Sequence, residues 1–144
     1  MNIREFQLWS FEVMSELASS VGIPEENRFY DGVTTYNPPE TGIHFRGWIR
    51  NYTSRDYSFA PPDQPRRIEN KGSLFFRIMF PVSTMALLNS SWELGILAQT
   101  RFRRRDHPCG IVCREANLDP VGAVSGEVYY QILLSVRYEF DEFQ

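Results

Sequence analysis

The chain has 144 residues, of which 42% are hydrophobic and 15% aromatic, and a chain of this size can bury the core of one globular domain. Its formal net charge of −3 argues against bulk attraction to nucleic acid or to an acidic membrane. The N-terminus lacks the apolar core of a signal peptide, and no apolar run approaches the ~20 residues of a membrane helix. We therefore expect one soluble domain, residues 1–144, that is kept in a cytoplasm and does not bind membrane.

The first predicted element is a helix over residues 2–21, because apolar residues recur there at steps of three and four. Asn2 is a candidate N-cap, and Glu5 follows at the spacing of a capping box. A glycine and a proline end the helix. Residues 25–42 are rich in turn formers, including Asn37-Pro38-Pro39, and are predicted to be an irregular arm over the surface.

Two strands and a long loop are predicted next. Residues 45–52 favour a strand around Trp48, whereas residues 55–70 carry three prolines and are predicted to be a loop. Residues 72–81 alternate as a strand does, and their second face is half apolar, which leaves open whether both faces of this strand are covered. A second helix is predicted over residues 84–100, with a cap at Ser83 or Thr84.

The C-terminal part predicts two more strands. Residues 111–118 are the first, and residues 119–126 are predicted to be a turn. From Val128 to Phe140 every even-numbered residue is apolar and most odd-numbered ones are polar, which indicates one strand of ~43 Å with one buried face. This exceeds a typical strand, so either a bend breaks it or part of it reaches beyond its own domain and offers an edge to a neighbour.

The order helix, strand, strand, helix, strand, strand is typical of an α+β domain. We expect a mostly antiparallel sheet of about four strands packed by two helices, with extended loops. No catalytic signature is present, and no enzymatic activity, cofactor or metal is predicted. His107, Cys109 and Cys113 lack the fourth ligand of a structural zinc site, so the two cysteines are expected as free thiols.

A run of arginines follows the second predicted helix, at Arg101, Arg103, Arg104 and Arg105. Three interpretations stay open for it. It is a solvated helix end whose cations complement the helix dipole, a patch that meets an acidic surface of a neighbouring subunit, or a patch that contacts phosphates of passing DNA without reading their sequence.

Several segments together resemble the tail terminator, or tail completion, proteins of long-tailed bacteriophages, the family that includes minor tail protein U. The matching pieces are Val21-Gly22-Ile23-Pro24, Asn37-Pro38-Pro39 within residues 36–42, Trp48-Ile49-Arg50, the strand 72–81 ending in Phe80-Pro81, Val121-Gly122, residues 126–131, and Phe140-Asp141-Glu142. The resemblance lies in the order and spacing of these pieces along most of the chain.

The resemblance implies a structural protein of the virion neck, assembled in the host cytoplasm. Such subunits form a homo-hexameric ring that caps the tail tube, stops its polymerisation and offers the head–tail joining surface to a connector or stopper protein. DNA passes through the lumen, and in contractile tails a similar ring contacts the sheath.

We expect the arginine run to line the lumen or an interface. The subunit or tube interface is expected to include Tyr36, Pro38, Pro39, Trp48, Arg66, Arg67, Phe75 and Tyr129. Two alternatives remain: another neck component, such as a head-closure or connector protein, and a small-ligand-binding or enzymatic α+β domain, which would need an apolar pocket with convergent polar groups.

Overall fold

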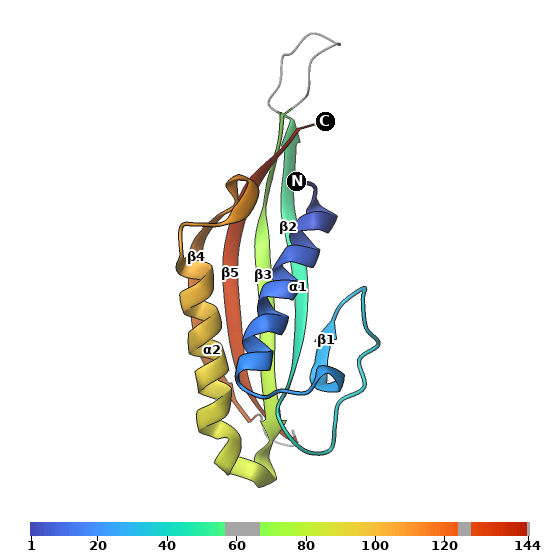
Figure 1. Cartoon of the computed structure of the whole chain (residues 1–144), viewed down its shortest axis with the longest axis vertical. Helices are drawn as coiled ribbons and strands as arrows, with labels where there is room; N and C mark the ends of the chain where they lie inside the picture. The colour runs from blue at the N-terminus through green and yellow to red at the C-terminus, as the bar shows by residue number, and fades with distance from the viewer. Residues whose placement is uncertain (57–66, 124–127, 144) are drawn as a thin grey trace.

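The computed structural model describes residues 1–56, 67–123 and 128–143. Two helices lie on one face of a long five-stranded sheet with the strand order β1-β2-β3-β5-β4 (Figure 1). The helices are α1 (Ile3–Ser20) and α2 (Leu88–Arg103), and the strands are β1 (Arg28–Tyr30), β2 (His44–Asp56), β3 (Arg67–Pro81), β4 (Val112–Gly122) and β5 (Tyr129–Phe143). Short 3-10 turns precede β1, α2 and β4: η1 (Glu25–Asn27), η2 (Val82–Leu87) and η3 (Pro108–Gly110).

This architecture confirms the α+β prediction and refines it in two respects. The sheet has five strands rather than about four, and it is mixed, because β1 pairs with β2 in parallel while the other pairs are antiparallel. Neither helix of the described ranges combines the length and the apolar character of a membrane-crossing segment.

Helix α1 begins as the sequence predicts. The side chain of Asn2 accepts a hydrogen bond from the Glu5 amide at 2.8 Å, and the Glu5 carboxylate accepts one from the Asn2 amide at 3.3 Å. Each bond satisfies an amide that the first helical turn leaves without a partner. The helix stops before Gly22, whose φ of +80° favours glycine.

The arm predicted over residues 25–42 is not irregular throughout. It contains β1, which pairs with β2 from Arg28 opposite Phe45 to Tyr30 opposite Gly47. Burial explains this strand, because Phe29 and Tyr30 are both buried, and a buried backbone needs hydrogen-bond partners that the sheet edge supplies. A strand of three residues is too short for an alternation pattern to reveal.

The predicted loop over residues 55–70 is wrong at both ends, and its middle, residues 57–66, lies outside the described residues. Strand β2 continues to Asp56 and β3 already begins at Arg67, with Asp56 opposite Ile68 in an antiparallel hairpin. The three prolines on which the prediction rested lie outside the described residues. The hairpin persists because β3 is also paired with β5 to its end, with Arg67 opposite Phe143.

The start of the second helix also differs from the prediction. Residues 82–87 form η2, and α2 begins at Leu88 and ends at Arg103. Neither Ser83 nor Thr84 caps α2, whose N-cap position is Leu87 without a side-chain bond. The Thr84 hydroxyl instead donates to the carbonyl oxygen of Pro81 at 2.9 Å, which ties η2 to the end of β3.

The last two strands correct the predicted turn and the predicted edge. Strand β4 extends to Gly122, and Pro120 lies opposite Ile132, a position that an edge strand tolerates. Strand β5 lies between β3 and β4, so it is an interior strand along most of its length and offers its edge to no neighbour there. Its alternation is confirmed, since Ile132, Leu134 and Val136 are fully buried.

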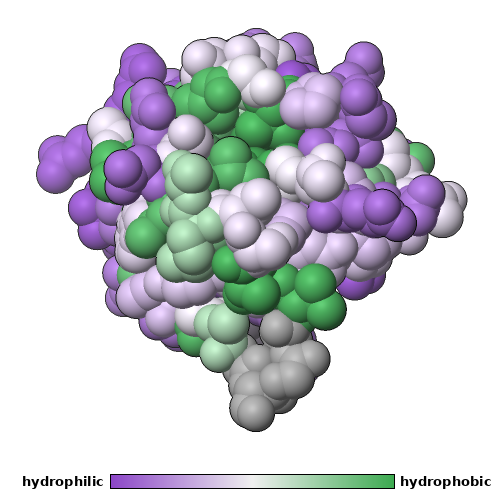
Figure 2. Space-filling model, turned by 90° about the horizontal axis from the view of Figure 1, so that it is seen from below, coloured by the Kyte–Doolittle hydropathy of each residue, from purple (hydrophilic) through white to green (hydrophobic). Residues whose placement is uncertain are grey.

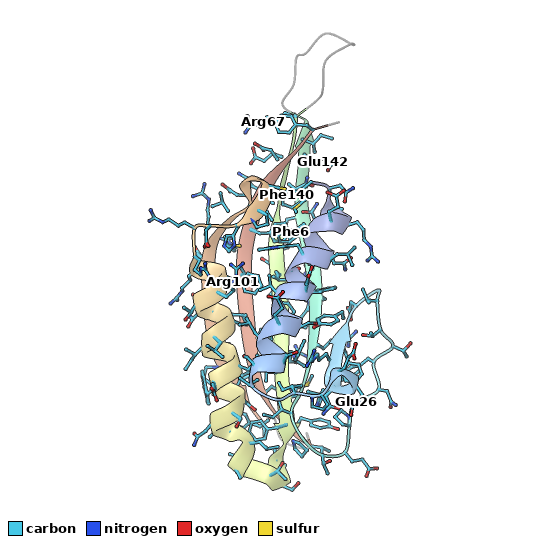
Figure 3. The ribbon with its side chains drawn as sticks, viewed as in Figure 1. Phe6, Glu26, Arg67, Arg101, Phe140 and Glu142 are labelled. Atoms are coloured by element: carbon cyan, nitrogen blue, oxygen red, sulfur yellow. The ribbon has the colours of Figure 1, made fainter. Side chains whose placement is uncertain are left out.

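The core lies between the helices and one face of the sheet. Its largest fully buried rings are those of Phe6, Phe45, Phe76, Phe80 and Phe102. Phe6 of α1 stacks on Phe140 of β5 with ring centres 5.1 Å apart (Figure 3). The other face of the sheet carries no helix in the described part of the chain (Figure 1), although the arm packs on one end of it, where Tyr36 contacts the buried His44 and Met79.

Candidate interaction surfaces

The open face of the sheet carries a patch of arginines and aromatic rings. Side chains alternate across a strand, so the neighbours in sequence of the buried Phe45, Phe76 and Ile78 point away from the helices. We call this patch the arginine–tryptophan face, and it consists of Arg46, Trp48 and Arg50 on β2 with Phe75 and Arg77 on β3. The register places Arg46 opposite Arg77 and Trp48 opposite Phe75.

Ring stacking organises the centre of this face. Trp48 and Phe75, both predicted interface residues, stack with centroids 5.2 Å apart and planes 20° apart. The guanidinium of Arg77 lies 5.4 Å from the centre of the Trp48 ring, within the range of a cation–π interaction. Both rings are half-buried, so part of each remains in contact with solvent.

A hollow of about 230 Å³ opens beside Trp48 and is lined by Asp31, Arg46, Trp48 and Arg77. Arg46 donates to Asp31 at 2.8 Å, which neutralises one of its arginines. The Nε atom of Arg77 is buried and has no hydrogen-bond partner among the described residues. This face therefore retains positive charge next to its rings.

The predicted contacts Tyr36, Pro39 and Tyr129 lie together at one end of the sheet. The Tyr129 hydroxyl donates to the carbonyl oxygen of Pro39 at 2.9 Å, and the Tyr36 hydroxyl lies 3.1 Å from Nε2 of His44. Burial lowers the pKa of His44 to about 4, which keeps its imidazole neutral near neutral pH. These residues fasten the arm to the sheet within one subunit, while Pro38 beside them is exposed.

The structure divides the arginine run. Arg101 turns toward His107, whose Nδ1 lies 3.4 Å from its Nη1, and Figure 3 shows Arg101 near the end of α2. The other members of the run line a pocket of about 470 Å³. Its walls are Arg103, Arg104, Arg105, His107, Ile111, Val112, Cys113 and Arg114, and we call it the arginine pocket.

The charges in the arginine pocket are only partly neutralised. Arg104 pairs with Asp106, and Arg114 pairs with Glu139, whose pKa is lowered chiefly by the hydrogen bond from Arg114. Arg103 and Arg105 are exposed and make no ion pair within the part of the chain that the structure describes. The pocket is therefore suited to an anionic partner.

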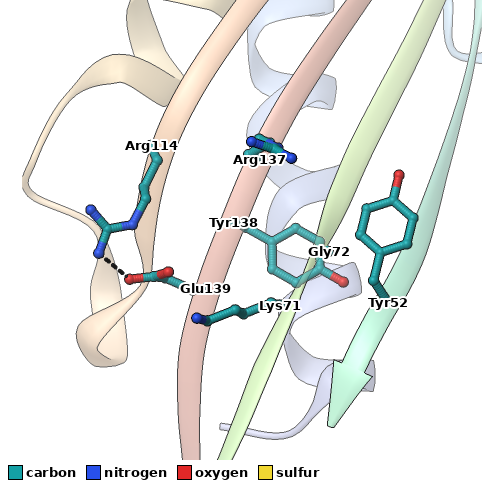
Figure 4. Close-up of a pocket in the computed structure, with 7 residues that line it drawn as sticks. All are labelled: Tyr52, Lys71, Gly72, Arg114, Arg137, Tyr138 and Glu139. Atoms are coloured by element: carbon teal, nitrogen blue, oxygen red, sulfur yellow. Dashed lines mark hydrogen bonds and ion pairs between the residues drawn. The ribbon is translucent and has the colours of Figure 1, made fainter.

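Arg114 is the residue of this pocket that sequence reasoning missed. Arg114 comes from β4 and lies beside Glu139 and near Lys71 and Arg137 (Figure 4). These residues line a second hollow of about 280 Å³. No sequence signal connects Arg114 with the arginine run. Only the pairing of β4 with β5 brings them to the same end of the sheet.

Arg67, another predicted interface residue, lies at the far tip of the sheet (Figure 3). Its Nε donates to the Asp141 carboxylate at 3.0 Å, so it fastens β3 to β5 within the subunit. Arg66, the last predicted interface residue, lies outside the described residues. The tip thus presents both charges on neighbouring strands.

An apolar patch occupies the opposite end of the molecule, seen end-on in Figure 2. Val82, Met85, Val121 and Val128 are each more than a third exposed, and we call them the apolar end. The Val82 amide donates to the Val128 carbonyl at 2.9 Å, so η2 and the start of β5 lie side by side. Sequence reasoning did not select these residues, because single exposed valines carry no distinctive pattern.

The two cysteines are free thiols, as expected. Cys109 is exposed, whereas burial raises the pKa of Cys113 to about 12. Within residues 1–56, 67–123 and 128–143, no group of three or more His, Cys, Asp or Glu side chains is arranged to hold a metal ion.

No protein-family model and no curated protein matches the chain. Eight chains of solved structures do. One of these, a protein without a descriptive name, matches over 99% of this chain and 99% of its own, with a TM-score of 0.56 and 12% sequence identity. At that identity the likeness shows a shared fold over the whole chain, and the function has to be argued from the surfaces.

Proposed function

We propose that this protein is a tail terminator of a long-tailed bacteriophage. In this proposal it is a non-enzymatic virion protein whose homo-hexameric ring caps the tail tube, stops its polymerisation and provides the head–tail joining surface. The observation that carries the proposal is the arginine–tryptophan face, where stacked rings and arginines lie on a sheet face that no helix covers in the described ranges.

A half-buried ring stack on an open sheet favours assembly. Removing apolar surface from water stabilises a contact by about 25 cal/mol per Å², and tryptophan and arginine are the residues most enriched among those that dominate interface energies. Trp48 and Phe75 are therefore expected to become covered by a partner. Their position in the middle of β2 and β3 suits a broad contact better than a small-molecule pocket.

The other surfaces suit the remaining contacts of a neck ring. The apolar end lacks charged side chains among its four residues and suits the last ring of the tail tube. The arginine pocket suits phosphates of DNA in the lumen, through charge and without sequence readout. The joining surface for a connector or stopper protein, and for sheath in a contractile tail, belongs to the rest of the ring.

A tube-capping assay tests this function. The tube protein of the same phage is polymerised with and without this chain, and tube lengths are measured by electron microscopy. We expect added protein to stop elongation and to leave a ring at one tube end. Unchanged tube lengths together with the absence of terminal rings would contradict the proposal, while rings that bind the connector but never the tube would favour a head-closure protein.

The arginine pocket is tested in the same system. Replacing Arg103, Arg104 and Arg105 by alanine should leave tube capping intact, because the apolar end is unchanged. Infectious assembly should fall and become more sensitive to salt, since contacts to phosphates weaken as salt rises. Full infectivity of this triple variant would show that the pocket belongs neither to the proposed lumen nor to the joining surface.

A further inference from the structure

We infer that the arginine–tryptophan face of one subunit docks against the outer stripe of α1 on the next copy of this chain. The inference rests on the proposed ring and adds the two surfaces that form its subunit interface. Charge complementarity between these two unlike surfaces of one molecule identifies a second copy of this chain as the partner.

The outer stripe of α1 consists of exposed residues at steps of three and four. We call Glu5, Leu8, Glu12 and Glu16 the acidic stripe. Leu8 is 46% exposed and lies between Glu5 and Glu12 on this helix face. Glu12 and Glu16 make no ion pair in the described part of the chain, and Arg4 beside the stripe donates to Gln7 at 2.8 Å.

The two surfaces match in pattern and length. On β2, Arg46 and Arg50 flank Trp48 over ~13 Å of strand. On α1, Glu5 and Glu12 flank Leu8 over ~10.5 Å of helix. The charge of Arg46 is already paired with Asp31, so Arg50 and Arg77 make the surface around Trp48 positive, whereas the surface around Leu8 is negative. The hollow beside Trp48 lies where the leucine would enter.

Arg77 gives a second reason for an acidic partner. Its guanidinium lies 5.4 Å from the centre of the Trp48 ring and makes no ion pair within the described ranges, and the residue lines the hollow beside Trp48. A glutamate carboxylate from the acidic stripe would pair with this guanidinium charge at the hollow. On docking, this carboxylate would lose its contact with water and gain contacts with Trp48 and Arg77.

The geometry makes this contact head-to-tail. Helix α1 covers one face of the sheet (Figure 1). The arginine–tryptophan face lies on the other, because its residues alternate along the strands with the buried Phe45 and Phe76. One subunit thus presents two unlike surfaces on opposite sides, and such heterologous contacts generate closed rings when the rotation between copies closes. A two-fold dimer would instead pair each surface with itself and bring like charges together.

Charge reversal on each surface tests the contact. The first variant carries Arg50→Glu and Arg77→Glu, and the second carries Glu12→Arg and Glu16→Arg. Each variant alone should need a protein concentration at least ~100-fold higher than the wild type to form rings, because each brings like charges together at the contact. An equimolar mixture should restore rings of alternating subunits, since both kinds of contact in the mixture are attractive. Native mass spectrometry reads the composition.

Two controls keep the test independent of folding. Glu25→Arg with Glu26→Arg makes the same charge change on η1, off the stripe (Figure 3), and should form rings as the wild type does. Trp48→Ala removes the ring stack without adding a charge and should also yield monomers. Circular dichroism must show that every variant is folded.

The outcomes separate this inference from the proposed function. Ring formation by either charge-reversed variant alone at wild-type concentrations would overturn the docking and leave the ring proposal standing. A mixture of the two variants that forms no rings would do the same. A wild-type protein that forms no ring, even on tail tubes, would overturn the proposed function and this interface with it.

Discussion

The two faces of strand β3 differ sharply although they share one backbone. Phe76 is fully buried against the helices, whereas its neighbour Phe75 is half-buried against Trp48 on the open face. The covered face holds an apolar core of rings and aliphatic side chains, and the open face mixes rings with arginines. The comparison teaches that one face of the sheet stabilises the fold while the other keeps rings and arginines partly exposed, and it is this second face that we propose for assembly.

Close packing makes the covered face intolerant of change. A Cβ atom added at Gly47 would lie 2.5 Å from Cε1 of Phe76, and one at Gly72 would lie 2.3 Å from the Arg50 carbonyl oxygen. The open face has hollows instead. Equal substitutions on the two faces should therefore have unequal effects on folding and on assembly.

The largest effect is expected for Phe76→Ala. Removing a fully buried ring leaves a cavity and should lower the free energy of unfolding by about 3–5 kcal/mol. Urea unfolding followed by circular dichroism measures this loss. A loss below ~1 kcal/mol would mean that the helix face is not the core of the fold.

Acid should destabilise the protein through His44. Burial lowers its pKa from the ordinary histidine value of 6.5 to about 4 in the folded chain, so the unfolded state takes up a proton first. The contribution is complete above pH 6.5 and is lost as pH falls from 6.5 to 4, by about 3 kcal/mol. Unfolding free energies measured across this range should decline more steeply in the wild type than in His44→Phe, and identical pH profiles would contradict this assignment.

Phe75→Ala sharpens the comparison most directly. Because the ring is half-buried, we expect the free energy of unfolding of the isolated subunit to fall by only about 1 kcal/mol. Ring formation should nevertheless be lost, as light scattering can show, since the stack with Trp48 would be broken. Normal ring formation by Phe75→Ala would show that the ring stack on the open face is not needed for assembly.

Asn2→Ala should have the smallest effect. Loss of the N-cap bond to Glu5 is expected to lower the free energy of unfolding by about 1 kcal/mol or less. The acidic stripe remains on α1, so rings should still form. Thermal unfolding together with the native mass checks both parts, and lost assembly in this stable variant would show that the helix end itself belongs to the interface.

The sequence predicts the elements whose signals are local. The capping box of Asn2 and Glu5 and the alternation from Ile132 to Phe140 follow from neighbouring residues, and both are confirmed. Strand β1 and the hairpin ends of β2 and β3 depend on partners distant in sequence, so neither propensity nor periodicity reveals them. Prolines led to the prediction of a loop over residues 55–70, and long-range pairing extends the strands into both ends of that range.

The candidate surfaces were predictable only in part. Trp48 and Phe75 were each named as interface residues, and the structure stacks them on one face; Arg103, Arg104 and Arg105 share one pocket. The structure uses Tyr129 and Arg67 in contacts within the subunit, which the sequence cannot distinguish from contacts between subunits. Arg77 and Arg114 were missed because their roles depend on cross-strand neighbours.

Native mass spectrometry of the wild-type protein, alone and with tail tubes, tests the central claim most directly. We predict a six-copy ring, in solution or at the tube end, that dissociates into folded monomers when Arg50 and Arg77 are changed to glutamate. A wild-type chain that stays monomeric at every concentration and never binds tail tubes would contradict the account.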